Sequence, residues 1–108
     1  MSNLFSLKVS EIADKIRNSD LNSVDLCKSY IEQINKFEKD VKAWAYIDKK
    51  LLLEKAEEAD NHRRSGKVVG PLHGIPVALK DIVGTYDMPT ECVTVLRKGK
   101  TESQNAEI

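Results

Sequence analysis

The sequence predicts an α/β fold in which N-terminal helices lead into a short buried strand. Apolar residues recur at helical spacing over much of the first 66 residues, which favours helices there. The chain then changes character at Gly70–Asp81, which reads GPLHGIPVALKD. Gly and Pro punctuate this stretch, and the short apolar run 75–79 inside it is typical of a buried strand.

The first two helices follow from apolar spacing and from capping residue types. A short amphipathic helix is predicted over about residues 9–18, with Ser10 as its cap. A second helix begins at Asn22, with Asp25 in its first turn. Its apolar stripe consists of Cys27, Tyr30, Ile31, Ile34 and Phe37. We interpret Cys27 and Tyr30 as packing residues and not as reactive groups.

A third helix is predicted over about residues 49–64, after a connector. The connector 41–47 alternates loosely and reads as a short strand or an extended segment. Asp48 caps the helix, and Ser65-Gly66 ends it. Leu52, Ala56 and Ala59 point inward, whereas charges such as Asp60 and Arg64, at i, i+4 spacing, predict a solvated face.

The composition of the chain indicates which binding partners and which cellular compartment to expect. Seventeen basic and seventeen acidic side chains balance, so there is no bulk electrostatic case for a nucleic-acid partner. Cys27 and Cys92 lie far apart and form no C-x-x-C pair, so neither a zinc site nor a redox motif is indicated. No signal-peptide core and no run of about 20 apolar residues is present. The sequence therefore predicts a cytoplasmic protein with free cysteines and no membrane partner.

The chain beyond Asp81 carries weaker signals. Gly84, Pro89 and Gly99 mark turns, and the apolar residues of 93–96 fit either a short strand or a loop. Residues 103–108 read as the opening of a helix that has been cut off, because capping residue types are followed by no apolar repeat. We therefore expect the chain to be truncated.

Lys80 stands directly after the apolar run and needs a physical explanation. Its side chain can extend to water, or it can be held in a desolvated pocket, where a lysine can lose its proton and act as a base. Asp81 follows it and would point to the opposite face of a strand. We therefore expect Asp81 to hydrogen-bond its loop in preference to pairing with Lys80.

The pattern Gly74, Pro76, Lys80 and Asp81, followed by Asp-Met-Pro-Thr at 87–90, resembles the amidase signature family. These are serine hydrolases with a Ser-cis-Ser-Lys arrangement. The resemblance implies that Lys80 is the catalytic base and that the helices pack around a central mixed sheet. It also implies two parts: an N-terminal helical segment, 1–66, and the start of the amidase-signature core, 67–108, which carries the lysine strand.

The resemblance further implies cleavage of a C–N amide bond in a small linear amide by serine acyl transfer. No cofactor and no metal is implied. In the family both serines lie in a glycine- and serine-rich segment that has no counterpart among these residues, so we predict that the chain alone is inactive. Val93 departs from the family, where a small Gly or Ala is common, and His73 is expected to hydrogen-bond within its own loop.

Two alternative functions remain open. The chain could be a non-catalytic fragment or interaction subunit that docks on a partner, since a sheet edge left open invites association, including a homo-oligomer. It could also be the A subunit of a glutamine-dependent aminoacyl-tRNA amidotransferase, which shares the signature. In the leading hypothesis the partner is a small-molecule amide substrate.

Overall fold

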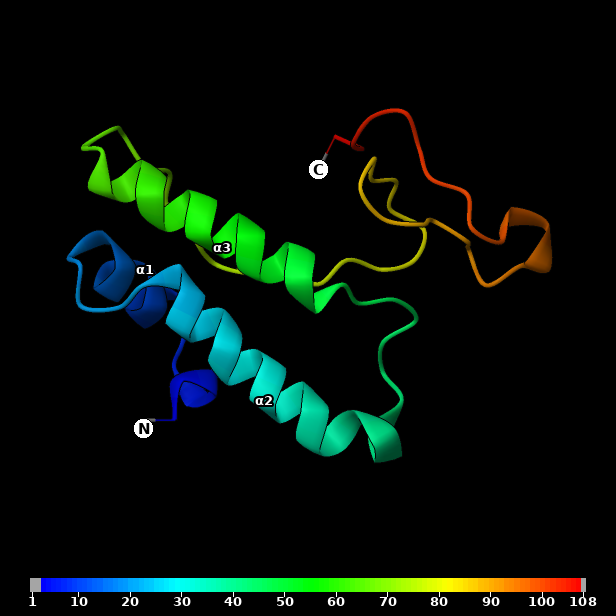
Figure 1. Ribbon diagram of the computed structural model, residues 1–108, viewed down its shortest axis with the longest axis horizontal. Coiled ribbons are helices and arrows are strands. Elements are labelled where there is room, and N and C mark those ends of the chain that lie inside the picture. Colours follow the sequence, from blue (N-terminus) through cyan, green and yellow to red (C-terminus); the bar gives the residue numbers. More distant parts are fainter. Residues whose placement is uncertain (1–2, 108) are drawn as a thin grey trace. The chain divides into compact units, whose positions relative to one another are not determined.

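The computed structural model describes residues 3–107 (Figure 1). These residues divide into two compact units. The helical unit comprises residues 3–43 and 48–76, and the loop unit comprises residues 44–47 and 77–107. The helical unit contains the 3-10 helix η1 (Leu4–Ser6) and the helices α1 (Val9–Arg17), α2 (Ser23–Val41) and α3 (Lys49–Arg64), whereas the loop unit contains only the 3-10 helix η2 (Val95–Arg97) among the described residues.

The three predicted helices are confirmed, and two of the three predicted caps are as expected. Asn22 Oδ1 accepts the backbone N–H of Asp25 at 2.8 Å, and Asp48 Oδ1 accepts that of Leu51 at 2.9 Å. These side chains satisfy backbone donors that a first helical turn leaves without partners. The prediction for Ser10 was wrong, because the N-cap residue of α1 is Lys8, two residues earlier, and Ser10 lies within the helix.

The core of the helical unit lies where α1, η1 and the first half of α2 meet. It consists of buried Leu4, Ile12, Ile16 and Leu26, with Leu7, Leu21, Tyr30 and Ile75 packed against them. Helices α2 and α3 pack side by side (Figure 1). Ala56, which was predicted to point inward from α3, is 4% exposed. Helical spacing identified the apolar faces only in part. Phe37, on the predicted stripe of α2, is 47% exposed, whereas Leu26, which is 0% exposed, was not on that stripe.

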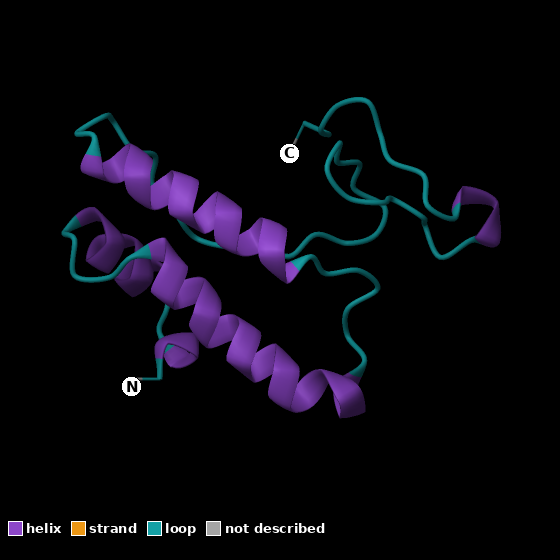
Figure 2. Cartoon of the chain, in the orientation of Figure 1, coloured by secondary structure: helices purple, strands orange, loops and turns teal. Residues whose placement is uncertain are grey.

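The predicted α/β class with a mixed sheet is wrong. No strand is present within residues 3–107 (Figure 2). The run 75–79 has no regular secondary structure, and Val77 is 70% exposed. An apolar run favours an extended backbone, but a strand also requires a second backbone to receive its hydrogen bonds. The described residues supply no such neighbour. The connector 41–47 after α2 is not a strand either.

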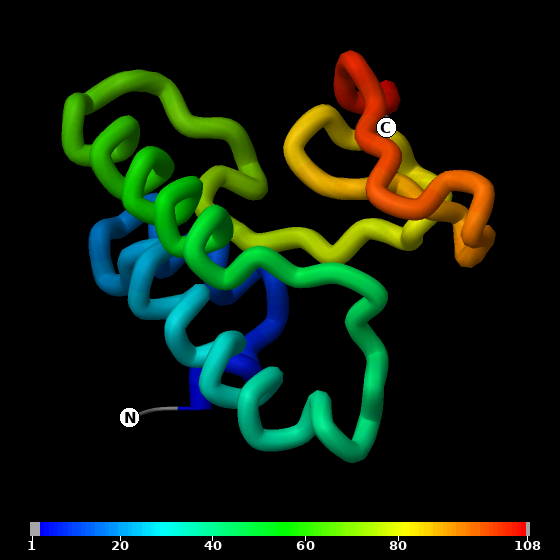
Figure 3. Tube along the Cα trace, turned by 45° about the vertical axis from the view of Figure 1, so that its right-hand side comes forward, coloured from blue at the N-terminus to red at the C-terminus, as the bar shows by residue number. Residues whose placement is uncertain are grey.

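Hydrogen bonds hold the loop unit together over long sequence separations. Thr90 N–H donates to the Lys100 carbonyl at 2.8 Å, and Ala106 N–H donates to the Gly84 carbonyl at 2.9 Å. Residues 84–90 and 100–106 are therefore linked by direct bonds, and the backbone trace of this segment is seen in Figure 3. Only Thr85 and Thr90 are buried here among the described residues.

The remaining predictions for this unit concern the segment 93–96 and the end of the chain. The segment forms a loop and part of η2 in place of a strand. The described tail residues 103–107 are not helical, and Ile108 lies outside the described residues. Across residues 3–107, no helix has the length and apolarity needed to cross a membrane.

Candidate functional site

Lys80, the predicted base, lies in the loop unit at the start of a tight turn. Its backbone carbonyl accepts the N–H of Val83 at 3.0 Å, so Lys80 is the first residue of that turn. The side chain is exposed, and Nζ makes no ion pair with any described residue. The amine is therefore accessible to a molecule that approaches the loop unit.

Asp81 hydrogen-bonds its loop, as expected. Its Oδ1 accepts the backbone N–H of Glu91 at 2.9 Å, and its carbonyl accepts the N–H of Cys92 at 3.0 Å. No ion pair joins it to Lys80 within the described residues. Two bonds from one residue thus fix the turn that carries Lys80 to a loop segment ten residues further along the chain.

The segment that receives these bonds is itself tied down by side chains. Glu91 Oε2 accepts the N–H of Gly99 at 2.6 Å, and Arg97 Nε donates to the Thr90 carbonyl at 3.0 Å. Arg97 also pairs with Glu102 at 2.5 Å. A cavity of about 450 Å³ in this unit is lined by Ile82, Thr90, Cys92, Arg97 and Glu102 together with the tail residues 103–106, and Lys80 does not line it.

A serine nucleophile for Lys80 is not found next to it. Ser103 is the only described serine in the loop unit. In the helical unit, Ser23 and Ser29 are buried, and Ser23 Oγ donates to the Gly74 carbonyl at 2.5 Å. Among the described serines, none forms a hydrogen bond with Lys80, so the described residues place no candidate nucleophile beside the predicted base.

Gly74, within the Gly70–Asp81 stretch, has a structural role in the helical unit. Its φ of +76° is a conformation that favours glycine. A Cβ at this position would lie 3.3 Å from Ser23 Cβ and 3.6 Å from Ile16 Cδ1. A side chain at position 74 would therefore require Ser23 at the start of α2 to shift by a few tenths of an ångström, in addition to the strain of the positive φ.

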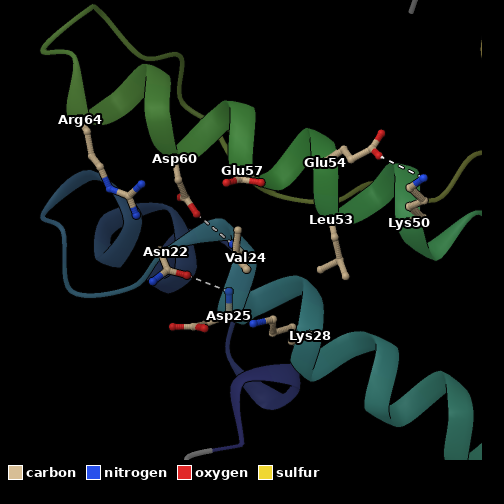
Figure 4. Close-up of a pocket in the computed structure, with 10 residues that line it drawn as sticks. All are labelled: Asn22, Val24, Asp25, Lys28, Lys50, Leu53, Glu54, Glu57, Asp60 and Arg64. Carbon is tan, nitrogen blue, oxygen red and sulfur yellow. Dashed lines mark hydrogen bonds and ion pairs between the residues drawn. The ribbon is translucent and has the colours of Figure 1, made fainter.

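Asp60 is a buried carboxylate whose role the sequence did not predict. It is 1% exposed, and one carboxylate oxygen accepts the N–H group of Ser23 at 2.7 Å. The other accepts the N–H group of Val24 at 3.0 Å (Figure 4). The prediction of a solvated face at this position was wrong. A carboxylate of α3 instead neutralises the positive end of α2, where backbone N–H groups and the helix dipole both favour a negative charge. Asp60 is thus an interhelical cap.

The surface groove beside Asp60 carries charges of both signs. It has a volume of about 540 Å³ and lies along α2 and α3, as Figure 4 shows. Basic residues Lys28, Lys50 and Arg64 face it together with acidic Asp25, Glu54 and Glu57. Lys50 and Glu54 pair at 4.0 Å within α3. Asp60 lines the groove as well, so four acidic and three basic side chains face it, and this near balance of charge gives no clear preference for an anion or a cation.

The two histidines bond backbone carbonyls through Nε2. His73 Nε2 lies 2.7 Å from the Ala59 carbonyl of α3, so the side chain bonds outside its own loop, and only the His73 backbone N–H bonds within the loop, to the Gly70 carbonyl at 3.2 Å. His62 Nε2 lies 3.0 Å from the Val68 carbonyl, and the two ring centroids are 5.2 Å apart. Within residues 3–107, no group of three or more His, Cys, Asp or Glu side chains could hold a metal ion. The histidines tie the loop 66–74 to α3.

The packing roles predicted for Cys27 and Tyr30 agree with their burial. Cys27 is 1% exposed, and Tyr30 packs against the core. Burial raises the pKa of the Cys27 thiol, a hydrogen bond with Ser23 lowers it, and the charge of Asp60 raises it. Burial also raises the pKa of Tyr30, with a further contribution from Cys27. A raised pKa keeps both groups neutral, as packing residues should be.

Comparison with known proteins finds relatives that match most or all of this chain. The A subunit of glutamyl-tRNA(Gln) amidotransferase from Streptomyces coelicolor is 33% identical over 99 residues, which cover 92% of this chain and 20% of that protein. The protein of the same name from Mycolicibacterium gilvum is 31% identical over 109 residues, covering 100% of this chain and 22% of that protein. A third, from Leptospira interrogans, is 33% identical over 92 residues, covering 85% of this chain and 19% of that protein.

The chain thus spans about a fifth of the length of the curated relatives it matches. No solved structure matches it. A sequence profile of the Amidase family matches residues 25–108, which include α3, nearly all of α2 and the whole segment from Gly70 to Asp81. The chain belongs to the amidase family.

Proposed function

We propose that this chain is part of an enzyme that acts on the C–N bond of an amide, with Lys80 as its general base. The observation that carries the proposal is the family match over residues 25–108, which includes the segment ending in Lys80 and Asp81. The lack of an ion pair to Lys80 among the described residues is compatible with this role, whereas its exposure means that the described residues do not supply the desolvation that the role requires. The reaction is hydrolysis, with water as the acceptor of the acyl group, or amide-nitrogen transfer.

In the proposed chemistry the neutral Lys80 amine accepts a proton from a bridging serine. That serine takes the proton of a second serine as its oxygen attacks the amide carbonyl, and it returns the proton to the leaving nitrogen as the C–N bond breaks. An ammonium group has no lone pair and cannot accept a proton. The residues that complete the site must therefore shield Lys80 from water, and they must supply both serines and the oxyanion donors.

A split-protein experiment tests the proposal. The chain is mixed with a polypeptide that carries the remaining four-fifths of the Streptomyces coelicolor relative, and ammonia release from a simple primary amide is measured. Loss of a general base lowers a rate by about 10²- to 10⁴-fold, so Lys80→Ala should have an effect of that size. Lys98→Ala, in the same unit, is the matched control. An unchanged rate for Lys80→Ala would overturn the assignment.

The isolated chain provides a second test. Residues that act as one catalytic unit lose nearly all activity when one member is missing. We therefore expect the chain alone to release no ammonia above the uncatalysed rate. A measurable rate that survives Lys80→Ala would show a different catalytic centre.

A second candidate is an interaction subunit that docks on a polypeptide carrying the rest of an amidase. The loop unit exposes a set of apolar side chains: Val77, Ile82, Val93, Val95 and Leu96, which are between 60% and 93% exposed. Surfaces of this kind are typical of contact with another protein. Sedimentation of the chain alone and of the split mixture separates the outcomes: a stable complex supports docking, self-association indicates a homo-oligomer, and a monomer in both samples argues against the candidate.

The names of the relatives favour amidotransfer as the reaction to test alongside hydrolysis. The three relatives described above are named as subunits of a glutamyl-tRNA(Gln) amidotransferase. In the split mixture supplied with glutamyl-tRNA whose side-chain carboxyl is activated as an acyl phosphate, phosphate leaves as the nitrogen bonds to the carbonyl carbon. Labelled amide nitrogen recovered in glutaminyl-tRNA would support this reaction, and release only as ammonia would support a hydrolase. Both cysteines are free, which suits the reducing cytoplasm as the compartment for either reaction.

A further inference from the structure

We propose that Asp81 is a positioning residue for Lys80, acting through the backbone of the 91–92 segment. The inference rests on the proposed function of Lys80 as a base. It goes beyond that function because it assigns a role to a carboxylate that neither accepts the transferred proton nor touches the amide.

The geometry of the turn supports this role. In the turn Lys80–Val83 the carbonyl of Lys80 accepts the Val83 N–H, so Asp81 occupies the first central position. Asp81 uses its side chain for Glu91 N–H at 2.9 Å and its carbonyl for Cys92 N–H at 3.0 Å. A hydrogen bond to a charged acceptor is shorter and stronger than one between neutral groups. Lys80 is thus covalently attached to the best-anchored residue of its turn.

The segment that receives these bonds is restrained on its far side as well. Glu91 also accepts the Gly99 N–H, and the N–H of Thr90 bonds the Lys100 carbonyl. Cys92 and Val93 both have left-handed backbones, with φ of +52° and +56°. Non-glycine residues seldom adopt this conformation unless surrounding contacts impose it. The Asp81 bonds are among the contacts that hold this strained segment in place.

The arrangement also keeps the Asp81 charge away from an ion pair with Lys80. A carboxylate paired with the lysine would favour the ammonium form, which cannot act as a base. Here the carboxylate oxygen bonds a backbone N–H, and Lys80 has no ion-pair partner within the described residues. The role therefore requires an acceptor oxygen at position 81 and does not require its charge.

The first test uses the chain as it is and needs no activity. Backbone ¹⁵N relaxation of Lys80 and hydrogen exchange of the Glu91 amide are compared among wild type, Asp81→Ala, Asp81→Asn and Asp87→Ala. Asn retains an acceptor oxygen, and Asp87 is the matched control because its carboxylate forms no ion pair among the described residues. We expect the Lys80 order parameter to fall from about 0.85 toward 0.6 only in Asp81→Ala. A Lys80 amide that stays rigid in Asp81→Ala overturns the proposal.

The second test measures turnover in the split mixture. We expect kcat to fall about tenfold in Asp81→Ala with KM unchanged, since loss of one hydrogen bond corresponds to about tenfold. In Asp81→Asn, which keeps the acceptor oxygen, kcat should stay within about threefold of wild type. If Lys80→Ala abolishes turnover but Asp81→Ala behaves like Asp87→Ala, only the positioning role fails. If Lys80→Ala has no effect, the proposed function fails, and the relaxation measurement still decides the role of Asp81.

Discussion

The helical unit and the loop unit achieve order in different ways. The helical unit buries Leu4, Ile12, Ile16 and Leu26 in a shared apolar core. The loop unit buries two threonines among its described residues, leaves most of its large apolar side chains exposed, and is held by backbone and side-chain hydrogen bonds. Burial of apolar surface supplies most of the favourable free energy of folding, whereas each hydrogen bond contributes a net ~1 kcal/mol. The loop unit should therefore be the less stable of the two.

The comparison also separates two kinds of polar residue. In the helical unit, Asp60 joins α3 to α2 through a carboxylate that is 1% exposed. In the loop unit, Asp81 plays a comparable part as an acceptor of a backbone N–H, but in a half-buried setting. Where water has no access, N–H groups that lose their acceptor find no replacement. Removal of the carboxylate should therefore lower the free energy of unfolding more at position 60 than at position 81.

The largest effect is expected for Asp60→Ala. The change removes two charge-assisted hydrogen bonds and leaves the Ser23 and Val24 N–H groups without acceptors, which should lower the free energy of unfolding by about 4 kcal/mol. Urea denaturation followed by far-UV circular dichroism measures it. The exposed Asp40 of α2 is the matched control, and Asp40→Ala should change stability by less than about 0.5 kcal/mol. Equal effects of the two changes would contradict the interhelical cap.

A smaller but still large effect is expected for Leu26→Ala. Leu26 is 0% exposed, and a Leu→Ala change at such a site leaves a cavity that costs about 3 kcal/mol. Val95, in the loop unit, is 87% exposed, so Val95→Ala should cost less than about 0.5 kcal/mol. Similar losses for the two variants in urea denaturation would show that the loop unit has an apolar core after all.

Alkaline pH should destabilise the helical unit selectively. Burial raises the pKa of Cys27 above its ordinary value, so the folded state keeps the thiol proton where the unfolded state loses it. This contribution is fully present below the unfolded-state pKa of about 8.5 and is lost as pH rises toward the folded-state value, with a slope of at most about 1.4 kcal/mol per pH unit.

The corresponding measurement is the free energy of unfolding between pH 7 and pH 10. Cys27→Ala should flatten the alkaline slope, whereas Leu26→Ala, which removes no titrating group, should lower stability by a similar amount at every pH. The residual slope in Cys27→Ala is expected to come in part from Tyr30, whose pKa burial also raises. An alkaline slope that Cys27→Ala leaves intact would contradict the assignment.

The smallest effect is expected for Val93→Gly. A β-branched residue at φ +56° is strained by about 1 kcal/mol, whereas glycine adopts this conformation without strain. The greater conformational entropy of glycine in the unfolded state opposes this gain by a somewhat smaller free energy. A net stabilisation of about 0.5 kcal/mol should follow, measured by native-state hydrogen exchange of the loop unit. The control is Val95→Gly, at a position without a positive φ, and it should destabilise. Destabilisation by Val93→Gly would show that the left-handed backbone is not strained.

Helices were predictable from the sequence because the information that specifies them is local. The spacing of Ile12 and Ile16 and the caps Asn22 and Asp48 lie within a few residues of the structure they determine. The strand prediction at 75–79 failed because pairing depends on a distant second segment, which an apolar run does not reveal. The bonds between 84–90 and 100–106 in the loop unit are non-local for the same reason.

In the candidate site, too, a local role was predicted and a non-local one was missed. The loop-bonding role of Asp81 was predicted from its place after Lys80 and is confirmed by its bond to Glu91. Asp60 was missed because i, i+4 charge spacing in α3 is typical of an exposed face, and its true partners at the start of α2 lie 36 and 37 residues earlier. One signal was available: α2 begins with several backbone donors, and Asn22 alone could not satisfy them. The catalytic role of Lys80 remains a prediction.

The single tryptophan of the chain, Trp44, belongs to the loop unit, whereas all three α-helices of the described residues belong to the helical unit. Intrinsic fluorescence and helical ellipticity therefore report on different parts of the same molecule. Two melting curves recorded on one unlabelled sample would not superimpose if the units unfold independently. Because Trp44 lies in the loop unit, the unfolding of each unit can be followed with its own spectroscopic signal, without a label.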